Sequence, residues 1–308
     1  MPQATREIKR RIRSIKNTRQ ITRAMELVSA AKMRKAVQNA LATRTYANLA
    51  WQMLTELSSR TDQSHHPLLQ KRETLKKVAV VVITSNRGLC GGFNHQLVQK
   101  MQKFIIEQQL KSVGLEADVV TVGKRGRDIL LRQGSSIVAE FPKADITTKT
   151  EDITPLAKLL MDDYLSGKYD KVLVAYTDFI SAISQKPRLK QILPIEQESG
   201  RQGVRKAESE FVATGHSLSD FNYEYTFEPS PDEVLEELLP RLLEIQIYQS
   251  LLESDASEHS ARMLAMRNAS EAAKDMIDSL TQAFNQARQA SITTELADIT
   301  GGRVAVEG

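Results

Sequence analysis

The chain has only one cysteine, Cys90, among its 308 residues. A single cysteine excludes an intramolecular disulfide and is typical of a protein from a reducing compartment. Long hydrophobic runs are also missing, since no apolar segment reaches the ~18 residues that a membrane span needs. We therefore expect no transmembrane segment. The N-terminus is Arg-rich and acid-poor, but its apolar spacing begins at Ile8 and continues, so we interpret it as a helix and expect no signal or transit peptide.

Glycine and proline are missing from two long stretches near the ends of the chain. The first sixty residues contain no glycine and only Pro2, and residues 242–299 contain neither glycine nor proline. Nothing in either stretch requires a helix to break. At about 1.5 Å per residue, roughly 58 residues would form a helix about 87 Å long. A compact domain of this chain cannot enclose such a helix, so we expect it to project.

Both stretches carry apolar residues at alternating spacings of three and four, which is typical of helices that pack along a seam. The expected N-terminal seam is Ile8, Ile12, Ile15, Thr18, Ile21, Met25 and Val28. The expected C-terminal seam is Leu242, Ile245, Gln249, Leu252, Ala256, His259, Met263, Met266, Ser270, Ala273, Ile277, Leu280, Phe284, Ala287, Ser291 and Thr294. The two seams predict an antiparallel coiled coil within one chain. We expect Pro229 and Pro231 to mark the start of the C-terminal helix and Pro240 to interrupt it.

Between these helices the sequence alternates between strand and helix patterns. This alternation predicts right-handed crossovers and a parallel sheet, so the fold class is α/β, with a Rossmann-like open sheet beside the coiled coil. The expected strands are 78–83, 117–122, 136–141 and 171–177, with helices at 95–112, 124–133 and 154–166. Residues 189–195 and 222–227 are expected as short edge strands on either side of a polar loop. The expected domains are 1–62, 63–230 and 231–308.

Basic residues are concentrated at the N-terminal end. Up to Arg44 there are twelve lysines and arginines against Glu7 and Glu26, a net charge of +10 in a chain whose total is +4. So basic a helix favours acidic surroundings, such as nucleic acid, anionic lipid or an acidic protein cavity, although a solvated helix face is the alternative. Aromatic residues are nearly absent from this region, and its apolar seam is already assigned to packing against the C-terminal helix, so we expect no nucleic-acid partner.

No group of residues indicates catalysis. The turn at residues 84–94 contains Gly88, Gly91 and Gly92 but neither a GxGxxG nor a GxxxxGK[ST] motif. Cys90 has no histidine nearby in the sequence, and the adjacent His65 and His66 lack further ligands at metal-binding spacing. We therefore expect no catalytic residue, cofactor or metal. A Rossmann-type enzyme and a basic coiled-coil scaffold remain the alternative functions.

Several motifs, in the right order, closely resemble the gamma subunit of F-type ATP synthases. The resemblance covers essentially the whole chain. The motifs that carry it are Glu7–Ile12, Asn17-Thr18, Ile21–Val28, Ala31–Arg34, Arg87–Gly92, Tyr225–Pro229, Ala261–Met266 and Ala287–Leu296.

This resemblance implies a non-catalytic rotary shaft. In that family the coiled coil stands inside a ring of three alpha and three beta subunits, and the α/β part rests with the epsilon subunit on the membrane c-ring. Proton flow turns the c-ring and the shaft, which drives the beta subunits through their binding states. The implied location is peripheral, on the cytoplasmic face of the bacterial inner membrane.

The resemblance also implies which residues bind partners. For the alpha/beta ring these are Arg10, Arg11, Lys16, Arg23, Met25, Arg288 and Gln289. For the c-ring and epsilon they are Tyr223, Tyr225 and Glu228. The sequence departs from the family at Asn86, where members often carry Asp, and at Arg303 and Glu307, where the tip is usually apolar. The chain lacks the cysteine pair of the chloroplast type, so we expect no thiol regulation.

Overall fold

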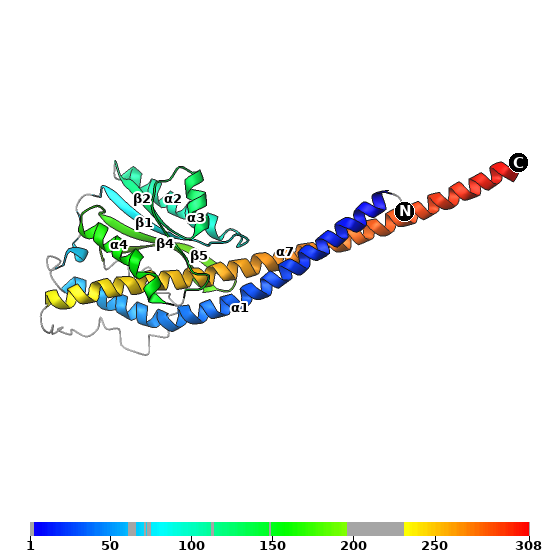
Figure 1. The fold of residues 1–308 in the computed structure, drawn as a ribbon. Coiled ribbons are helices and arrows are strands. Elements are labelled where there is room, and N and C mark those ends of the chain that lie inside the picture. The colour runs from blue at the N-terminus through cyan, green and yellow to red at the C-terminus, as the bar shows by residue number, and fades with distance from the viewer. Residues whose placement is uncertain are drawn as a thin grey trace. The chain divides into compact units, whose positions relative to one another are not determined.

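A computed structural model describes residues 3–60, 66–70, 72, 75–111, 114–147, 149–195 and 231–307. The chain divides into two compact units. We call Ala31–Ala261 the α/β unit, and Met1–Ala30 together with Arg262–Gly308 the helical unit. Two long helices, α1 (Gln3–Arg60) and α7 (Pro231–Glu307), each contribute to both units (Figure 1).

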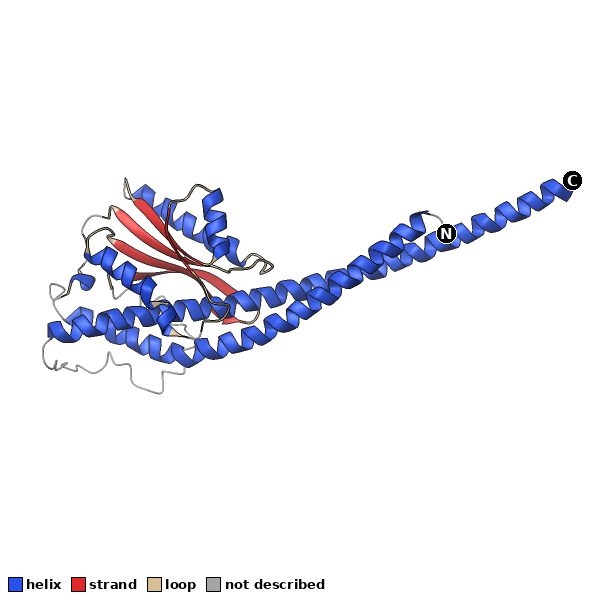
Figure 2. Ribbon diagram, viewed as in Figure 1, coloured by secondary structure: helices blue, strands red, loops and turns tan. Residues whose placement is uncertain are grey.

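The α/β unit contains a five-stranded sheet in the order β3-β2-β1-β4-β5 (Figure 2). Its strands are β1 (Lys77–Ile83), β2 (Glu116–Val122), β3 (Ile137–Phe141), β4 (Lys171–Ser181) and β5 (Ser184–Leu193). The four predicted strands are confirmed, and they pair in parallel. β5 runs antiparallel to β4 and starts five residues before its predicted start, because β4 continues to Ser181 and closes a hairpin. The expected strand at 222–227 and the loop before it lie outside the described residues.

Helices cover both faces of this sheet. They are α2 (Phe93–Lys111), α3 (Lys124–Arg132) and α4 (Thr154–Leu165), with short 3₁₀ turns η2 (Pro67–Leu69) and η3 (Thr150–Asp152). On β1, Val80 packs into the core with α2 and α3, whereas its neighbour Val81 packs into the core that includes α1, α4 and α7. Because successive side chains of a strand point to opposite faces, burial on both sides requires the continuous apolar run seen in the sequence.

The turns after β1 and β2 approach each other closely. Gly123 has a φ of +100°, and a Cβ added to it would lie 2.3 Å from the carbonyl oxygen of Thr84. The Thr84 hydroxyl also accepts a 2.9 Å hydrogen bond from the backbone N–H of Gly126. Glycine at position 123 therefore lets the two turns meet at the carboxyl ends of neighbouring strands.

Pro240 does not interrupt α7, so that expectation was wrong. A proline inside a helix costs roughly 3 kcal/mol, because it removes one backbone hydrogen bond and crowds the preceding turn. Four leucines around it are buried: Leu235, Leu239, Leu242 and Leu243. Each fully buried leucine contributes about 1.5–3 kcal/mol, so their packing exceeds the cost of the proline.

The seam of α1 differs from the predicted one in the helical unit. Ile8, Ile12 and Ile15 are half-buried as expected, but Ile21 is 60% and Val28 55% exposed. Beyond Ile15 the predicted seam residue Met25 is half-buried, and the half-buried Thr22 and buried Ser29 continue the seven-residue interval of Ile8 and Ile15. The prediction chose Ile21 and Val28 because their side chains are large and apolar, but the residues that face the partner helix are the next ones, Thr22 and Ser29. A seven-residue interval keeps one face of a helix towards its partner, whatever the size of the side chains. In α7 the predicted seam is covered at every position except Thr294.

Candidate functional site

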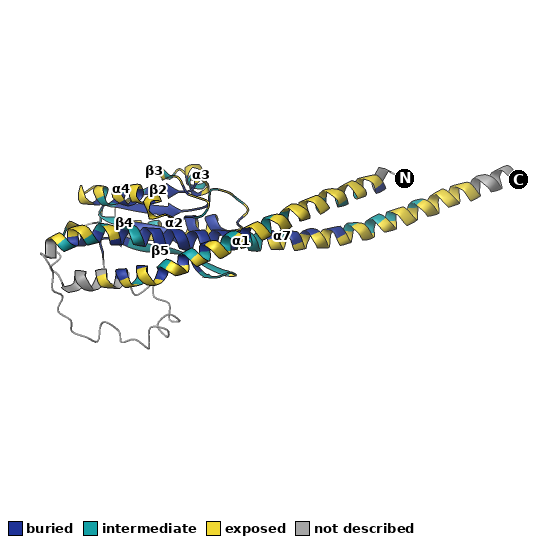
Figure 3. Cartoon of the chain, turned by 60° about the horizontal axis from the view of Figure 1, so that its bottom comes forward, coloured by how far each residue is buried: buried dark blue, intermediate teal, exposed yellow. Residues whose placement is uncertain are grey.

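The predicted ring-binding residues of α1 lie in the helical unit. Arg10, Arg11, Lys16 and Arg23 are exposed and Met25 is half-buried. Figure 3 shows that exposed residues dominate this end of α1. Arg11 pairs with Glu7 at 2.8 Å and Arg23 with Glu26 at 2.7 Å. Both arginine side chains are at least 60% exposed, and surface ion pairs contribute at most about 1 kcal/mol, so these pairs do not commit the arginines strongly to their own helix. This part of α1 presents an accessible, strongly basic surface.

Arg288 and Gln289 are exposed on α7, and every residue from 292 to 300 is exposed as well. The stretch remains helical, and the hydroxyl of Thr293 donates a 3.0 Å hydrogen bond to the carbonyl of Gln289. Ile292, Leu296 and Ile299 are 49–68% exposed and share one helix face by their spacing. The end of α7 thus offers polar and apolar contacts to another molecule. The predicted c-ring and epsilon residues, Tyr223, Tyr225 and Glu228, lie outside the described residues.

A buried polar segment of α7 was not predicted as a site. Its members are Gln246, Gln249, Ser250, Glu253, Ser254, Asp255, Ser257, Glu258, His259 and Ser260, all buried in the α/β unit. Charged residues are almost never fully buried unless they are paired. One signal was present in the sequence: residues 242–261 contain four acidic residues and no lysine or arginine. Once buried, such a segment needs basic partners from elsewhere in the chain.

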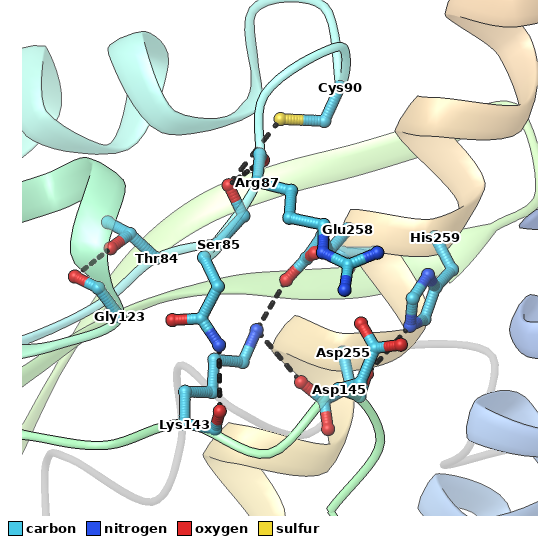
Figure 4. Close-up of polar contacts among 12 residues, drawn as sticks. Thr84, Ser85, Arg87, Cys90, Gly123, Lys143, Asp145, Asp255, Glu258 and His259 are labelled. Carbon is cyan, nitrogen blue, oxygen red and sulfur yellow. Dashed lines mark hydrogen bonds and ion pairs between the residues drawn. The ribbon is translucent and has the colours of Figure 1, made fainter.

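Lys143, in the turn after β3, is one of those partners. Its Nζ lies 2.9 Å from Asp255 Oδ1 and donates a hydrogen bond to Glu258 (Figure 4). Burial alone would lower the pKa of Lys143, but the two carboxylates outweigh burial and raise it above its ordinary value. The backbone N–H of Thr147 donates a 2.8 Å hydrogen bond to Asp255 Oδ2. His259 Nε2 lies 2.9 Å from the carbonyl oxygen of Asp145, so both ends of this turn are attached to α7.

The glycine-rich turn after β1 is attached to the same region. The Asn86 side chain donates a 2.7 Å hydrogen bond to the carbonyl of Lys143 and accepts one from the backbone N–H of Lys124. An aspartate cannot donate the first of these bonds, so asparagine at this position has a structural role here. Cys90 is buried, and its sulfur lies 3.3 Å from Asn94 Nδ2 and 3.7 Å from Ser85 Oγ (Figure 4).

A second polar group lies between α1, α7 and the β4–β5 hairpin. Arg44 pairs with Glu253 at 3.0 Å and Arg188 with Asp178 at 3.0 Å. These four residues, with Lys190, line a cavity of about 40 Å³. That volume and polar lining suit ordered water, which needs about 10–15 Å³ per molecule. Arg44, the last of the twelve basic residues counted in the sequence, is buried here.

Lys190 also lines this cavity. Its Nζ donates a 2.6 Å hydrogen bond to Gln246 Oε1 and lies 4.5 Å from the centre of the Trp51 ring. Burial of the amine lowers the pKa of Lys190 to about 8, and Arg188 contributes in the same direction. Although the residue as a whole is half-buried, its amine is enclosed by these neighbours.

We expect the stability of the wild type, measured relative to Lys190→Met, to increase with pH. Between about pH 8 and 10.5 the unfolded lysine binds more protons than the folded one, so deprotonation favours folding as pH rises through this window. The increase from pH 7.5 to 9.5 should be on the order of 2 kcal/mol, measured by urea unfolding. Lys186→Met, at an exposed position of the same strand, is the control and should show no such trend. A pH-independent difference for Lys190→Met would contradict the assignment.

Two further observations concern the described part of the chain. Its His, Cys, Asp and Glu side chains do not gather into any group of three or more suited to a metal ion. None of its helices combines the length and apolar character that a membrane span requires.

Comparison with known proteins places these features in context. A family model described as ATP synthase matches residues 4–306. The chain is 45% identical over 305 residues to a protein named ATP synthase gamma chain from Chloroflexus aurantiacus, covering 98% of this chain and 99% of that protein. It is 42% identical over 310 residues to the ATP synthase gamma chain of Herpetosiphon aurantiacus, covering 98% and 99%.

Solved structures show the same fold. A chain of the Euglena gracilis mitochondrial ATP synthase, in a structure of OSCP, F1 and the c-ring, matches with a TM-score of 0.64 and 18% identity, covering 98% of this chain and 94% of that chain. A chain of the Tetrahymena thermophila mitochondrial ATP synthase, in a structure of the central stalk and c-ring, matches with a TM-score of 0.60 and 23% identity, covering 81% and 99%.

Proposed function

Because the chain belongs to the ATP synthase family as a gamma chain, a non-catalytic subunit of the central stalk, we propose that it carries torque between a membrane c-ring and catalytic beta subunits. The observation that carries this proposal is the 45% identity over 98% of the chain and 99% of its relative. A match that spans both proteins from end to end includes the long terminal helices as well as the sheet. The alternative of an unrelated basic scaffold does not account for similarity in the α/β unit.

The proposed partners on the ring side are three alpha and three beta subunits. The exposed basic residues at the start of α1, among them Arg10, Arg11, Lys16 and Arg23, favour an acidic cavity. Arg288 and Gln289 on the exposed part of α7 are proposed to contact acidic loops of the beta subunits. The planar guanidinium of arginine offers several donors in a fork that matches a carboxylate, and glutamine adds a donor and an acceptor.

On the membrane side we propose contact with the c-ring and the epsilon subunit. Tyr223, Tyr225 and Glu228 are the residues proposed for it, on the resemblance at Tyr225–Pro229. The proposed location is the cytoplasmic face of a bacterial inner membrane, with the chain held there by its partners.

We expect Arg288→Glu to weaken coupling while leaving assembly intact. The reversed charge would face carboxylates, and a charge-assisted hydrogen bond contributes on the order of 1.5–3 kcal/mol, or about tenfold or more in a rate that depends on it. The assay is proton-driven ATP synthesis in membranes that carry the complex, normalised to the amount of assembled complex. Arg288→Lys keeps the charge and should lose less activity than Arg288→Glu.

Two results would separate the parts of this proposal. A tagged wild-type chain that fails to co-purify with alpha, beta and epsilon subunits would contradict the assembly. Unchanged ATP synthesis with Arg288→Glu in a normally assembled complex would contradict the proposed contact of Arg288 with the beta subunits and leave the rest of the proposal intact.

A further inference from the structure

We propose that the buried polar segment of α7 is the joint through which torque passes between the α/β unit and α7. This inference rests on the proposed function. We call Gln246–Ser260 of α7, together with the polar groups it binds on α1, the turn after β3 and the β4–β5 hairpin, the polar joint. All of it lies within the α/β unit.

The chemistry of the segment does not fit a role in stability alone. Apolar burial is non-directional, and replacing buried ion pairs by apolar residues of similar volume is often neutral or stabilising. Hydrogen bonds, in contrast, weaken steeply when their angles change. Hydrogen bonds on two opposite faces of a helix therefore add resistance to rotation and sliding beyond that of shape-complementary apolar packing.

Contacts with α1 hold one side of the segment. The Gln246 amide donates a 2.6 Å hydrogen bond to the carbonyl of Ala47, and the Gln249 amide donates one of 3.2 Å to the carbonyl of Ala40. The Arg44 guanidinium donates a 3.1 Å hydrogen bond to Glu253 Oε1. These three bonds bind successive turns of α7 to successive turns of α1.

Contacts with the sheet hold the same face further along the helix, because residues 246, 249, 253, 257 and 260 follow one stripe by their spacing. The Ser257 hydroxyl donates a 2.9 Å hydrogen bond to the carbonyl of Thr177 on β4. The Ser260 hydroxyl donates to the carbonyl of Ala182 in the β4–β5 turn, and Gln185 of β5 donates a 3.1 Å hydrogen bond to that same hydroxyl. Ser260 is the residue before Ala261, where the α/β unit ends, so these bonds fix α7 directly before it continues into the helical unit.

The Lys143 group holds the opposite side of the helix. Lys143 binds Asp255 and Glu258, which are three residues apart and share a face of the helix. The side chain of Lys143 is 1% exposed and that of Asp255 is fully buried, so salt does not screen this link as it would a surface pair. The same turn belongs to the carboxyl end of the sheet, and Figure 4 shows how it approaches α7. Torsion applied to the sheet therefore reaches α7 through directional bonds.

The test replaces this link by neutral side chains of similar size. In the triple variant Lys143→Met, Asp255→Asn, Glu258→Met, no buried charge of the group remains unpaired, and the amide oxygen introduced at position 255 can still accept from the backbone N–H of Thr147. We expect the thermal unfolding midpoint and assembly to stay close to those of the wild type. Two activities are compared in assembled complexes. Proton-driven ATP synthesis in membranes applies torque to the α/β unit. ATP hydrolysis by the detached alpha/beta ring with this chain applies no torque to that unit.

The expected result is a several-fold fall in proton-driven synthesis with unchanged hydrolysis by the detached ring. Hydrogen exchange of the Thr147 amide in the full chain should be about tenfold faster, reporting a looser attachment of the turn. The control is the double variant Asp163→Asn, Lys168→Met, which removes a 2.8 Å ion pair that is partly exposed in the same unit. It should leave both activities unchanged.

Each other outcome has a defined meaning. Wild-type values in both assays for the triple variant would contradict the transmission of torque through the polar joint and would leave the proposed function intact. If the triple variant does not assemble, Glu258→Gln replaces it, and an equal fall in both activities would then overturn the proposal. A wild-type chain that supports neither activity would instead contradict the proposed function itself.

Discussion

Gly123→Ala is expected to lower the free energy of unfolding of the α/β unit by on the order of 4 kcal/mol. The added Cβ would lie 2.3 Å from the carbonyl oxygen and 2.9 Å from the carbonyl carbon of Thr84. Both are backbone atoms, so no side-chain rotation relieves the clash, and overpacking of this kind costs about 1–3 kcal/mol. The φ of +100° adds roughly 1–2 kcal/mol for a residue with a Cβ. Urea unfolding followed by circular dichroism measures the change.

Gly114→Ala is the matched control. Its φ is +87°, but a Cβ there meets nothing within 4 Å. Only the backbone strain should appear, so Gly114→Ala should cost about 1–2 kcal/mol. Equal losses for the two variants would show that strain alone, and not the approach of the two turns, explains the effect at Gly123.

Arg44→Met is expected to lower the free energy of unfolding by about 3–5 kcal/mol, because it leaves a buried carboxylate without its partner. Arg44 is 8% exposed and contacts Glu253 at 3.0 Å. Burial already raises the pKa of Glu253 above its ordinary value, Arg44 opposes that shift, and Asp178 adds to it. Removing Arg44 therefore moves the pKa of Glu253 further upward.

The sign of the pH dependence follows from this shift. A carboxyl whose folded pKa is raised binds more protons in the folded state, so the stability of the variant falls as pH rises above the unfolded pKa. The deficit of Arg44→Met relative to the wild type should thus be smaller at pH 5 than at pH 7.5. Arg34→Met, at an exposed position of the same helix, is the control and should change stability by less than about 0.5 kcal/mol. A similarly small change for Arg44→Met would mean that the Glu253 carboxylate tolerates the loss of its partner.

The long helices and the parallel strands follow from local pattern, which is why they could be predicted. Seven-residue spacing and the absence of glycine and proline are properties of neighbouring residues, and so is the continuous apolar run at Val78–Ile83. Pro240 was misjudged because the leucines that hold the helix around it act through the tertiary core. The same limit explains the α1 seam, since the side chain that is covered at position 29 is a serine.

The exposed candidate residues and the buried polar joint differ in how far the sequence could predict them. Arg10, Arg11, Lys16, Arg23, Arg288 and Gln289 are exposed, as a partner-binding role requires, and their roles remain proposals. Lys143 and Asp255 are 112 positions apart, and no spacing rule joins them. Only the acidic excess of residues 242–261 indicated that distant basic partners exist.

The positions of α1 and α7 in the chain also affect synthesis of the protein. α1 ends at Arg60 and α7 begins at Pro231, so 170 residues separate the two helices. At about 5–20 residues per second, a ribosome needs roughly 10–35 s to produce that interval. During this time Ile8, Ile12 and Ile15 have no partner helix to cover them. Because α7 is the last element of the sequence, the coiled coil can be completed only when translation is almost finished.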